Sequence, residues 1–210
     1  MRPLPLLALC LAAAAPAAPD PVGRYRLTGE HDVVSELVIA RGGRFQYGLI
    51  AGALDEEASG RWQQTGSQIR LTTLPKPVPP SFAAGAAKRS ADGRLVLHVV
   101  WPNGHDAVGT DLKIDFESGP PLLTYVGGPD GWTLPDDEAR RPVAVTLQLS
   151  MFGFVSPRFP IDTAGGSDLS FVITPHDLGR IAFDGFPIDV QPGKLIVHRG
   201  EATLTYVRVP

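Results

Sequence analysis

Apolar and polar residues alternate along many short stretches of this chain. In residues 143–151 every second position from Val143 to Met151 is apolar, and residues 111–117 alternate in the same way. This period of two is typical of a strand with one buried side and one side that faces water. The pattern therefore predicts antiparallel sheet with one face packed on a core.

The same reading divides the chain into two groups of strands. Eight strands are expected before residue 127, at residues 24–29, 34–40, 44–49, 58–64, 68–73, 94–101, 109–117 and 122–126. Five are expected after it, at residues 143–151, 169–174, 180–183, 195–199 and 203–208. Tight glycine turns at residues 41–43 and 65–67 favour hairpins between sequence neighbours, so the first group predicts an up-and-down meander. Eight such strands are enough to close a small barrel.

Two breaks interrupt these strands. The proline-rich residues 74–80 predict an extended crossover, and the alanine-rich run that follows to Lys88 predicts one short helix. Residues 127–142 contain a Gly-Gly-Pro-Asp-Gly sequence and an acidic run, which is typical of a domain boundary. We therefore expect an all-β protein with a barrel of about eight strands at residues 18–126, a linker at 127–142 and a small β-sandwich-like domain at 143–210.

Turn and aromatic positions in the first group resemble the calycin group of β-barrels, which includes lipocalins and avidins. The matching pieces are Gly23-x-Tyr25 opening the first strand, Gly43-Arg44-Phe45 after a hairpin, Gly60-Arg61-Trp62 and the hairpin exit at residues 66–71. Tyr25 stands where lipocalins have Trp. The resemblance implies a barrel whose interior binds a small apolar or amphipathic ligand.

The second group is similar to the transthyretin-like modules that follow exported carboxypeptidases. Residues 174–183 resemble the turn and aromatic strand of that module, and the Pro192-Gly193 turn precedes another strand. The resemblance implies a domain without catalytic residues.

The first 17 residues predict a secretory signal peptide. Arg2 precedes an apolar run at residues 4–15 that is too short to span a bilayer, and Ala15 and Ala17 suit cleavage after residue 17. The chain's one cysteine, Cys10, lies in this run, and the bulky Leu9 before it disfavours acylation. We expect an exported, periplasmic protein that does not span the membrane once the signal is removed and that has no disulfide.

The charge distribution argues against a nucleic-acid partner. The formal net charge is -3, and the basic residues are scattered along the chain without forming a stripe. The acidic run at residues 55–57 lacks the alternating ligand spacing of a calcium loop and is interpreted as a solvated turn.

The sequence contains no serine-nucleophile elbow, phosphate-binding glycine loop or His-Glu-x-x-His motif, so no catalytic residues are assigned. Three histidines, His31, His105 and His176, each precede an aspartate. Imidazole and carboxylate groups can together hold zinc, so these three residues are the candidate metal ligands. Because all three pairs have turn-like surroundings, we interpret them as surface turns and expect no cofactor.

Aromatic residues within the expected strands are the remaining candidates for a binding site. Tyr47, Trp62, Trp101 and Phe116 would line an apolar pocket if they all faced into one barrel. The sequence therefore favours an exported, non-catalytic β-protein that binds a small apolar molecule or a partner in the cell envelope. Two alternatives remain open, namely a periplasmic metal-dependent hydrolase that uses the His-Asp pairs and an envelope scaffold protein without a pocket.

Overall fold

The computed structural model describes residues 18–90, 93–162 and 167–210. The expected signal peptide, with Cys10, lies outside the described residues. Within these ranges the protein is all-β, and its one helix is the short 3-10 turn η1 (Ser150–Phe152). None of the described helices has the length and apolar character needed to cross a membrane.

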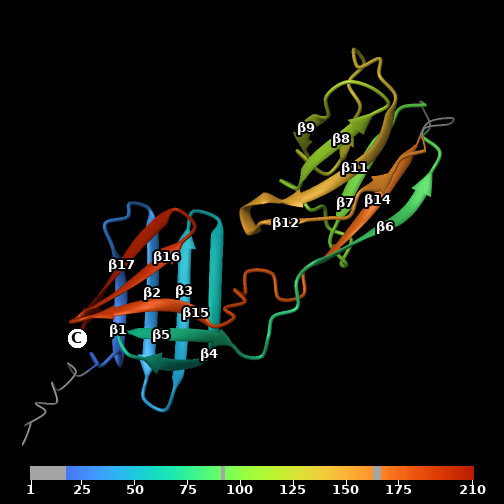
Figure 1. Cartoon of the computed structure of the whole chain (residues 1–210). Coiled ribbons are helices and arrows are strands. Elements are labelled where there is room, and N and C mark those ends of the chain that lie inside the picture. The colour runs from blue at the N-terminus through green and yellow to red at the C-terminus, as the bar shows by residue number, and fades with distance from the viewer. Residues whose placement is uncertain (1–17, 91–92, 163–166) are drawn as a thin grey trace, which may run out of the picture.

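Eight antiparallel strands form a closed barrel (Figure 1). Each strand pairs with the next along the barrel, and the last pairs with the first to close it. The strands are, in order around the barrel, β1 (Gly23–Thr28), β2 (Val33–Ala40), β3 (Arg44–Ala51), β4 (Leu54–Thr65), β5 (Gln68–Thr73), β15 (Phe186–Gln191), β16 (Lys194–Arg199) and β17 (Ala202–Val209). The predictions of an all-β fold and of an eight-stranded antiparallel barrel are confirmed.

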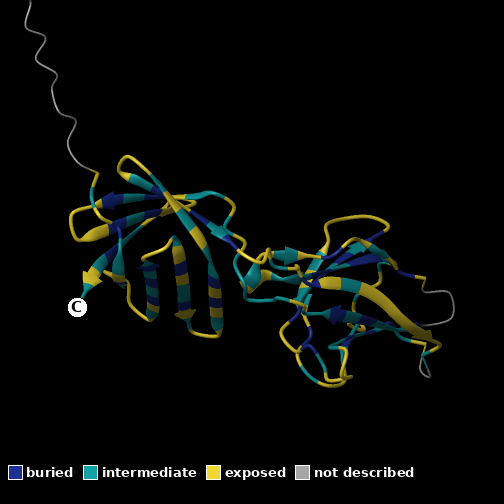
Figure 2. Cartoon of the chain, turned by 90° about the horizontal axis from the view of Figure 1, so that it is seen from below, coloured by how far each residue is buried: buried dark blue, intermediate teal, exposed yellow. Residues whose placement is uncertain are grey.

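The alternation of the sequence explains which side chains fill the barrel. Ile39 and Phe45 are register partners across the β2–β3 hairpin, and each is 1% exposed. Gly42 and Gly43 in that turn have φ of 81° and 77°, a conformation that residues with a Cβ seldom adopt. Figure 2 shows buried and exposed residues alternating along the barrel strands. The buried core consists of Tyr25, Leu37, Ile39, Phe45, Ala58, Ile69, Leu71, Ile188, Val190, Leu195, Val197 and Tyr206.

A β-sandwich is inserted between β5 and β15 of the barrel (Figure 1). One sheet has the order β10-β7-β14-β6, in which β7 and β14 are parallel, and the other has the order β12-β11-β8-β9 with β13 also paired to β11. Apolar side chains from both sheets form one buried cluster. The strands are β6 (Ser81–Lys88), β7 (Val96–Val100), β8 (Asp111–Phe116), β9 (Leu122–Tyr125), β10 (Trp132–Thr133), β11 (Pro142–Leu149), β12 (Phe154–Val155), β13 (Phe159–Pro160) and β14 (Asp168–Thr174).

This strand order differs from the division expected at residues 127–142. β7 and β8 lie in the expected barrel segment but pair with β14 and β11 of the sandwich, and β10 lies within the expected linker. The three strands nearest the C-terminus, β15 to β17, complete the barrel. Alternation shows which side of a strand is buried, but it does not show which strand lies beside it.

Two local expectations were wrong. The alanine-rich residues Ser81–Lys88 form strand β6, because pairing with β14 overrides the helix propensity of alanine. The expected strand at residues 180–183 has only an isolated bridge, Glu57 to Arg180, and the regular strand begins at Phe186.

Candidate functional site

A carboxylate is buried at one end of the barrel interior. Glu56 on β4 points inward with Ala58, two residues further along the strand, and is 5% exposed. The guanidinium of Arg199, the last residue of β16, binds it through two hydrogen bonds. Nη1 donates to Oε2 at 2.7 Å and Nη2 donates to Oε1 at 2.8 Å. This two-point geometry matches the planar fork of arginine to the two carboxylate oxygens and is a strong form of ion pair.

Two tyrosine hydroxyls extend this polar group. The Tyr47 hydroxyl donates to Glu56 Oε2 at 3.3 Å. The Ser35 hydroxyl donates to the carbonyl of Gly48 at 2.7 Å, and its oxygen lies 2.8 Å from the Tyr206 hydroxyl. Because serine has a single hydroxyl proton, Tyr206 is the donor in this second contact.

Burial keeps both phenols protonated. It raises the pKa of Tyr47 far above the ordinary value, and the nearby Tyr206 and Glu56 raise it further. Burial also raises the pKa of Tyr206, and this effect outweighs the opposing influence of the positive charge on Arg199. Both side chains are therefore neutral at physiological pH and are available as hydrogen-bond donors or acceptors.

An apolar cavity of about 180 Å³ adjoins these polar groups inside the barrel. Three of its lining residues, Tyr47, Arg199 and Tyr206, carry the polar atoms described above. The rest of its wall consists of Leu37, Leu71, Ile181, Ala182, Phe183, Phe186, Ile188, Val197 and Leu204. The cavity is thus apolar on most sides and polar at one end.

Residues 177–183, here called the strap, form part of the wall of this cavity. The amide of Ile181 donates to the Glu57 carbonyl at 2.8 Å, and the amide of Thr73 donates to the Phe183 carbonyl at 2.9 Å. These bonds place the strap beside the first half of β4, where β5 no longer pairs with it. The Phe183 ring lies 5.4 Å from the Tyr47 ring and 5.0 Å from the Phe186 ring, measured between centroids. Its side chain therefore closes the barrel interior from the strap side.

The four aromatic residues expected to line one pocket lie in three places. Tyr47 lines the barrel cavity. Trp62 packs against the barrel core, and its indole Nε1 donates to the Ala40 carbonyl at 3.0 Å, outside the cavity wall. Trp101 and Phe116 belong to the core of the sandwich. The strand alternation identified buried aromatic residues without showing which of the two cores they fill.

The three candidate metal ligands lie in different parts of the fold. His31 is in the turn between β1 and β2, His105 is between β7 and β8 of the sandwich, and His176 follows β14. His176 has a φ of 44°, and its Nε2 lies 3.2 Å from the Ser81 hydroxyl. Across residues 18–90, 93–162 and 167–210, no three His, Cys, Asp or Glu side chains are grouped so as to hold a metal ion.

The sequence reading missed Glu56, Arg199, Tyr206 and Phe183. Glu56 was interpreted as part of a solvated acidic turn, whereas β4 begins at Leu54 and turns this carboxylate inward. Glu56 lies two residues before Ala58, and this spacing indicates that both face the same side of the strand. The acidic neighbours Asp55 and Glu57 instead suggested a solvated turn. Arg199, Tyr206 and Phe183 come from the segment that was expected to form a separate domain.

Comparisons with models of known protein families, with curated proteins and with solved structures found no match to this chain. The fold and the contacts within it therefore carry the functional argument. They define an all-β protein whose closed eight-stranded barrel contains an apolar cavity with a polar end and carries an inserted sandwich.

The raised pKa values of Tyr47 and Tyr206 predict a loss of stability in alkaline solution. Tyrosines in the unfolded chain ionise near pH 10, whereas these two stay protonated in the folded chain. Below about pH 10 their stabilising contribution is fully present, and it is lost as the pH rises from there towards the folded-state pKa values. Chemical unfolding at a series of pH values, with tyrosinate absorbance recorded in parallel, measures this loss.

Tyr47→Phe provides the comparison for this experiment. At neutral pH we expect it to lower the free energy of unfolding by about 1 kcal/mol, because one hydrogen bond to Glu56 is removed. Above about pH 10 it should lose less stability than the unmodified protein. An unchanged alkaline loss in the double variant Tyr47→Phe, Tyr206→Phe would contradict the assignment.

Proposed function

We propose that the protein binds a small, electrically neutral molecule inside the barrel, with its apolar part in the cavity and a hydroxyl or carbonyl group at the polar end. The observation that supports this proposal is the apolar cavity that ends on Tyr47, Arg199 and Tyr206. An apolar wall with a few placed polar groups is the usual composition of a ligand site.

The size and charge of the cavity define the class of ligand. A volume of about 180 Å³ is below the usual range for pockets that hold drug-sized ligands, so the ligand has few heavy atoms. Arg199 is already neutralised by Glu56, and both phenols are uncharged. A charged ligand group would have to displace part of this ion pair, whereas a neutral hydroxyl can bind beside it.

The calycin resemblance and the export of the chain belong to the same proposal. The antiparallel pairing of all strands around the closed barrel supports the calycin resemblance, as does Tyr25, which is the third residue of β1 and is fully buried. We propose that the ligand is taken up outside the cytoplasm, most simply in a periplasm, after removal of residues 1–17. Recognition of a cell-envelope partner is the alternative for the same compartment.

Binding of p-cresol tests the proposed site. Its ring suits a small apolar cavity, since a cavity of about 150 Å³ can bind benzene, and its hydroxyl suits the polar end. We expect calorimetry or NMR titration to show saturable binding that is tighter for p-cresol than for toluene. Tyr206→Phe should reduce the difference between the two, because it removes a polar group from the cavity wall.

Val197→Phe and Ile196→Phe are matched variants for this titration. Val197 lines the cavity, whereas the neighbouring Ile196 points to the opposite side of β16 and is not part of the wall. Filling the cavity at position 197 should weaken p-cresol binding by about tenfold or more, and the change at position 196 should leave it within about twofold. Equal affinities in these two variants would disprove binding inside the barrel.

A further inference from the structure

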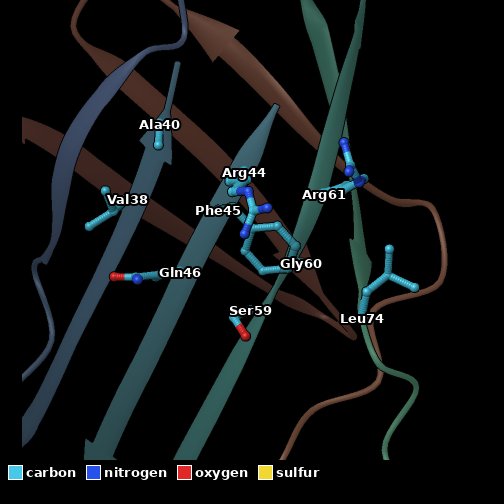
Figure 3. Close-up of a pocket in the computed structure, with 9 residues that line it drawn as sticks. All are labelled: Val38, Ala40, Arg44, Phe45, Gln46, Ser59, Gly60, Arg61 and Leu74. Atoms are coloured by element: carbon cyan, nitrogen blue, oxygen red, sulfur yellow. The ribbon is translucent and has the colours of Figure 1, made fainter. Parts of the chain in front are cut away.

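Two arginines face each other on the outer wall of the barrel. Arg44 on β3 and Arg61 on β4 are direct register partners, and both side chains are exposed. Figure 3 labels both side chains among the residues that line one hollow over β3 and β4. Like charges directly opposite each other on neighbouring strands destabilise a sheet.

Neither arginine forms an ion pair with a carboxylate of the described residues. Within the part of the chain that the structure describes, no ion pair or side-chain hydrogen bond reaches the guanidinium of Arg44 or Arg61. Two carboxylates on the same outer wall are engaged elsewhere, since Glu36 lies 3.6 Å from Arg24 and from Arg26, and Glu57 lies 3.6 Å from Arg180. Among the described residues, no carboxylate therefore compensates the repulsion between Arg44 and Arg61.

The two arginines border a hollow of about 490 Å³ that is separate from the barrel cavity. Gln46 and Ser59, the next outward-facing register pair, also line it, and their side chains make no hydrogen bond to another described residue. Val38, Ala40 and the half-exposed Leu74 supply apolar surface. The hollow thus offers two cations, an amide and a hydroxyl beside an apolar wall.

The backbone at Gly60 accounts for the shape of this hollow. β4 exchanges its partnership with β3 for one with β5 around this residue, and a Cβ there would lie 2.0 Å from the Thr72 carbonyl oxygen. The amide of Leu74 donates to the Ser59 carbonyl at 3.0 Å, which holds Leu74 at the edge of the hollow. The site is therefore built on paired strands whose positions are fixed by backbone hydrogen bonds.

We propose that Arg44 and Arg61 bind a phosphate group on the outer wall of the barrel, with Gln46 and Ser59 as further donors to its oxygens. A phosphate dianion balances two guanidinium charges, and the planar fork of arginine fits its oxygens. The apolar wall accommodates the body to which the phosphate is attached. The group can be free phosphate, a soluble phosphate monoester or a phospholipid headgroup, because all three present anionic phosphate oxygens to the guanidinium groups. The phosphodiester of a headgroup carries one negative charge and would balance one of the two arginines.

This site is independent of the proposed ligand in the barrel. Arg44 and Gln46 point outward, whereas Phe45 between them points into the core and is 1% exposed. Opposite faces of β3 therefore belong to the two sites. Loss of p-cresol binding would leave the phosphate proposal intact.

The test uses the full chain without residues 1–17 and two double variants of equal charge change. The test variant is Arg44→Gln, Arg61→Gln, and the control is Arg24→Gln, Arg26→Gln, which removes two outward-facing arginines that adjoin Glu36 on the same barrel. Inorganic phosphate is titrated by calorimetry at constant ionic strength. Phosphatidylglycerol vesicles and phosphatidylcholine vesicles are compared by co-flotation.

We expect the test variant to lose about tenfold or more in phosphate affinity and the control to change by about threefold at most. Without phosphate, the test variant should unfold at a higher temperature than the unmodified protein, because the repulsion between the two arginines is gone. Capture by phosphatidylglycerol vesicles, lost only in the test variant, would support a headgroup, and phosphate binding without capture would support a soluble ligand. Equal loss in both double variants, or no binding of either probe, would overturn the proposal.

Discussion

Replacing Gly60 by alanine should lower the free energy of unfolding by on the order of 3 kcal/mol. The added Cβ would lie 2.0 Å from the Thr72 carbonyl oxygen and 2.8 Å from the Leu74 amide nitrogen. Both are backbone atoms in or beside the β4–β5 ladder, so they cannot move away without breaking strand pairing. Urea denaturation of the variant and of the unmodified protein measures the difference.

Gly48→Ala is the matched control for this change. Gly48 lies on β3 beside β4, its φ is not positive, and a Cβ there would have no atom within 4 Å. We expect its stability to stay within about 0.5 kcal/mol of the unmodified protein. A similar loss in both variants would show that glycine at position 60 is not required by the close approach of β4 and β5.

Arg199→Leu is expected to lower the free energy of unfolding by about 2 kcal/mol. The change leaves the Glu56 carboxylate buried with only Tyr47 as a hydrogen-bond partner. Removing one partner of a fully buried ion pair costs about 3–5 kcal/mol, and the cost is smaller here because the Arg199 side chain is 47% exposed. Thermal and urea unfolding of the variant give the size of the loss.

Two further variants identify the cause of this effect. Arg158→Leu removes an ion pair of the same 2.7 Å length from the surface, where Asp115 keeps Lys113 at 3.8 Å, so we expect a loss below about 1 kcal/mol. The double variant Glu56→Leu, Arg199→Leu should recover part of the stability that Arg199→Leu loses, because no uncompensated charge remains buried. If the double variant were less stable than Arg199→Leu alone, the buried carboxylate would not be the source of the loss.

Local sequence patterns were sufficient to predict many of the strands and two of the hairpins, but not the strands β6 and β15. The glycine turn at residues 41–43 correctly joins β2 to β3, and the turn at residues 65–67 correctly joins β4 to β5. Neighbouring strands that pair across a short turn need no information from distant parts of the chain. The pairing of β5 with β15 does need information from distant parts of the chain, because the whole sandwich lies between these two strands in the sequence. Period-two alternation is the same in a barrel and in a sandwich, so it could not show where one ended and the other began.

The candidate site was predictable only in part, for the same physical reason. Tyr47 was expected to line a pocket, and it does line the barrel cavity. Trp101 and Phe116 have the same inward pattern but fill the sandwich core. Glu56 meets Arg199 only when β4 and β16 belong to one barrel, and charged residues in a strand otherwise indicate its wet face. The polar end of the cavity therefore depends on long-range pairing that the local pattern does not contain.

The insertion of the sandwich within the barrel sets an order for folding during synthesis. Every strand of the sandwich has been made by Thr174, whereas the barrel cannot close until β17 is complete at Val209. Until β15 is made, β1 and β5 are the open edges of a five-stranded sheet, and β1 stays open until β17 pairs with it. Open edges invite pairing with other chains. The last strands of the chain thus protect the first ones, and truncation before Phe186 would leave two aggregation-prone edges exposed on a chain that still has all the strands of the sandwich.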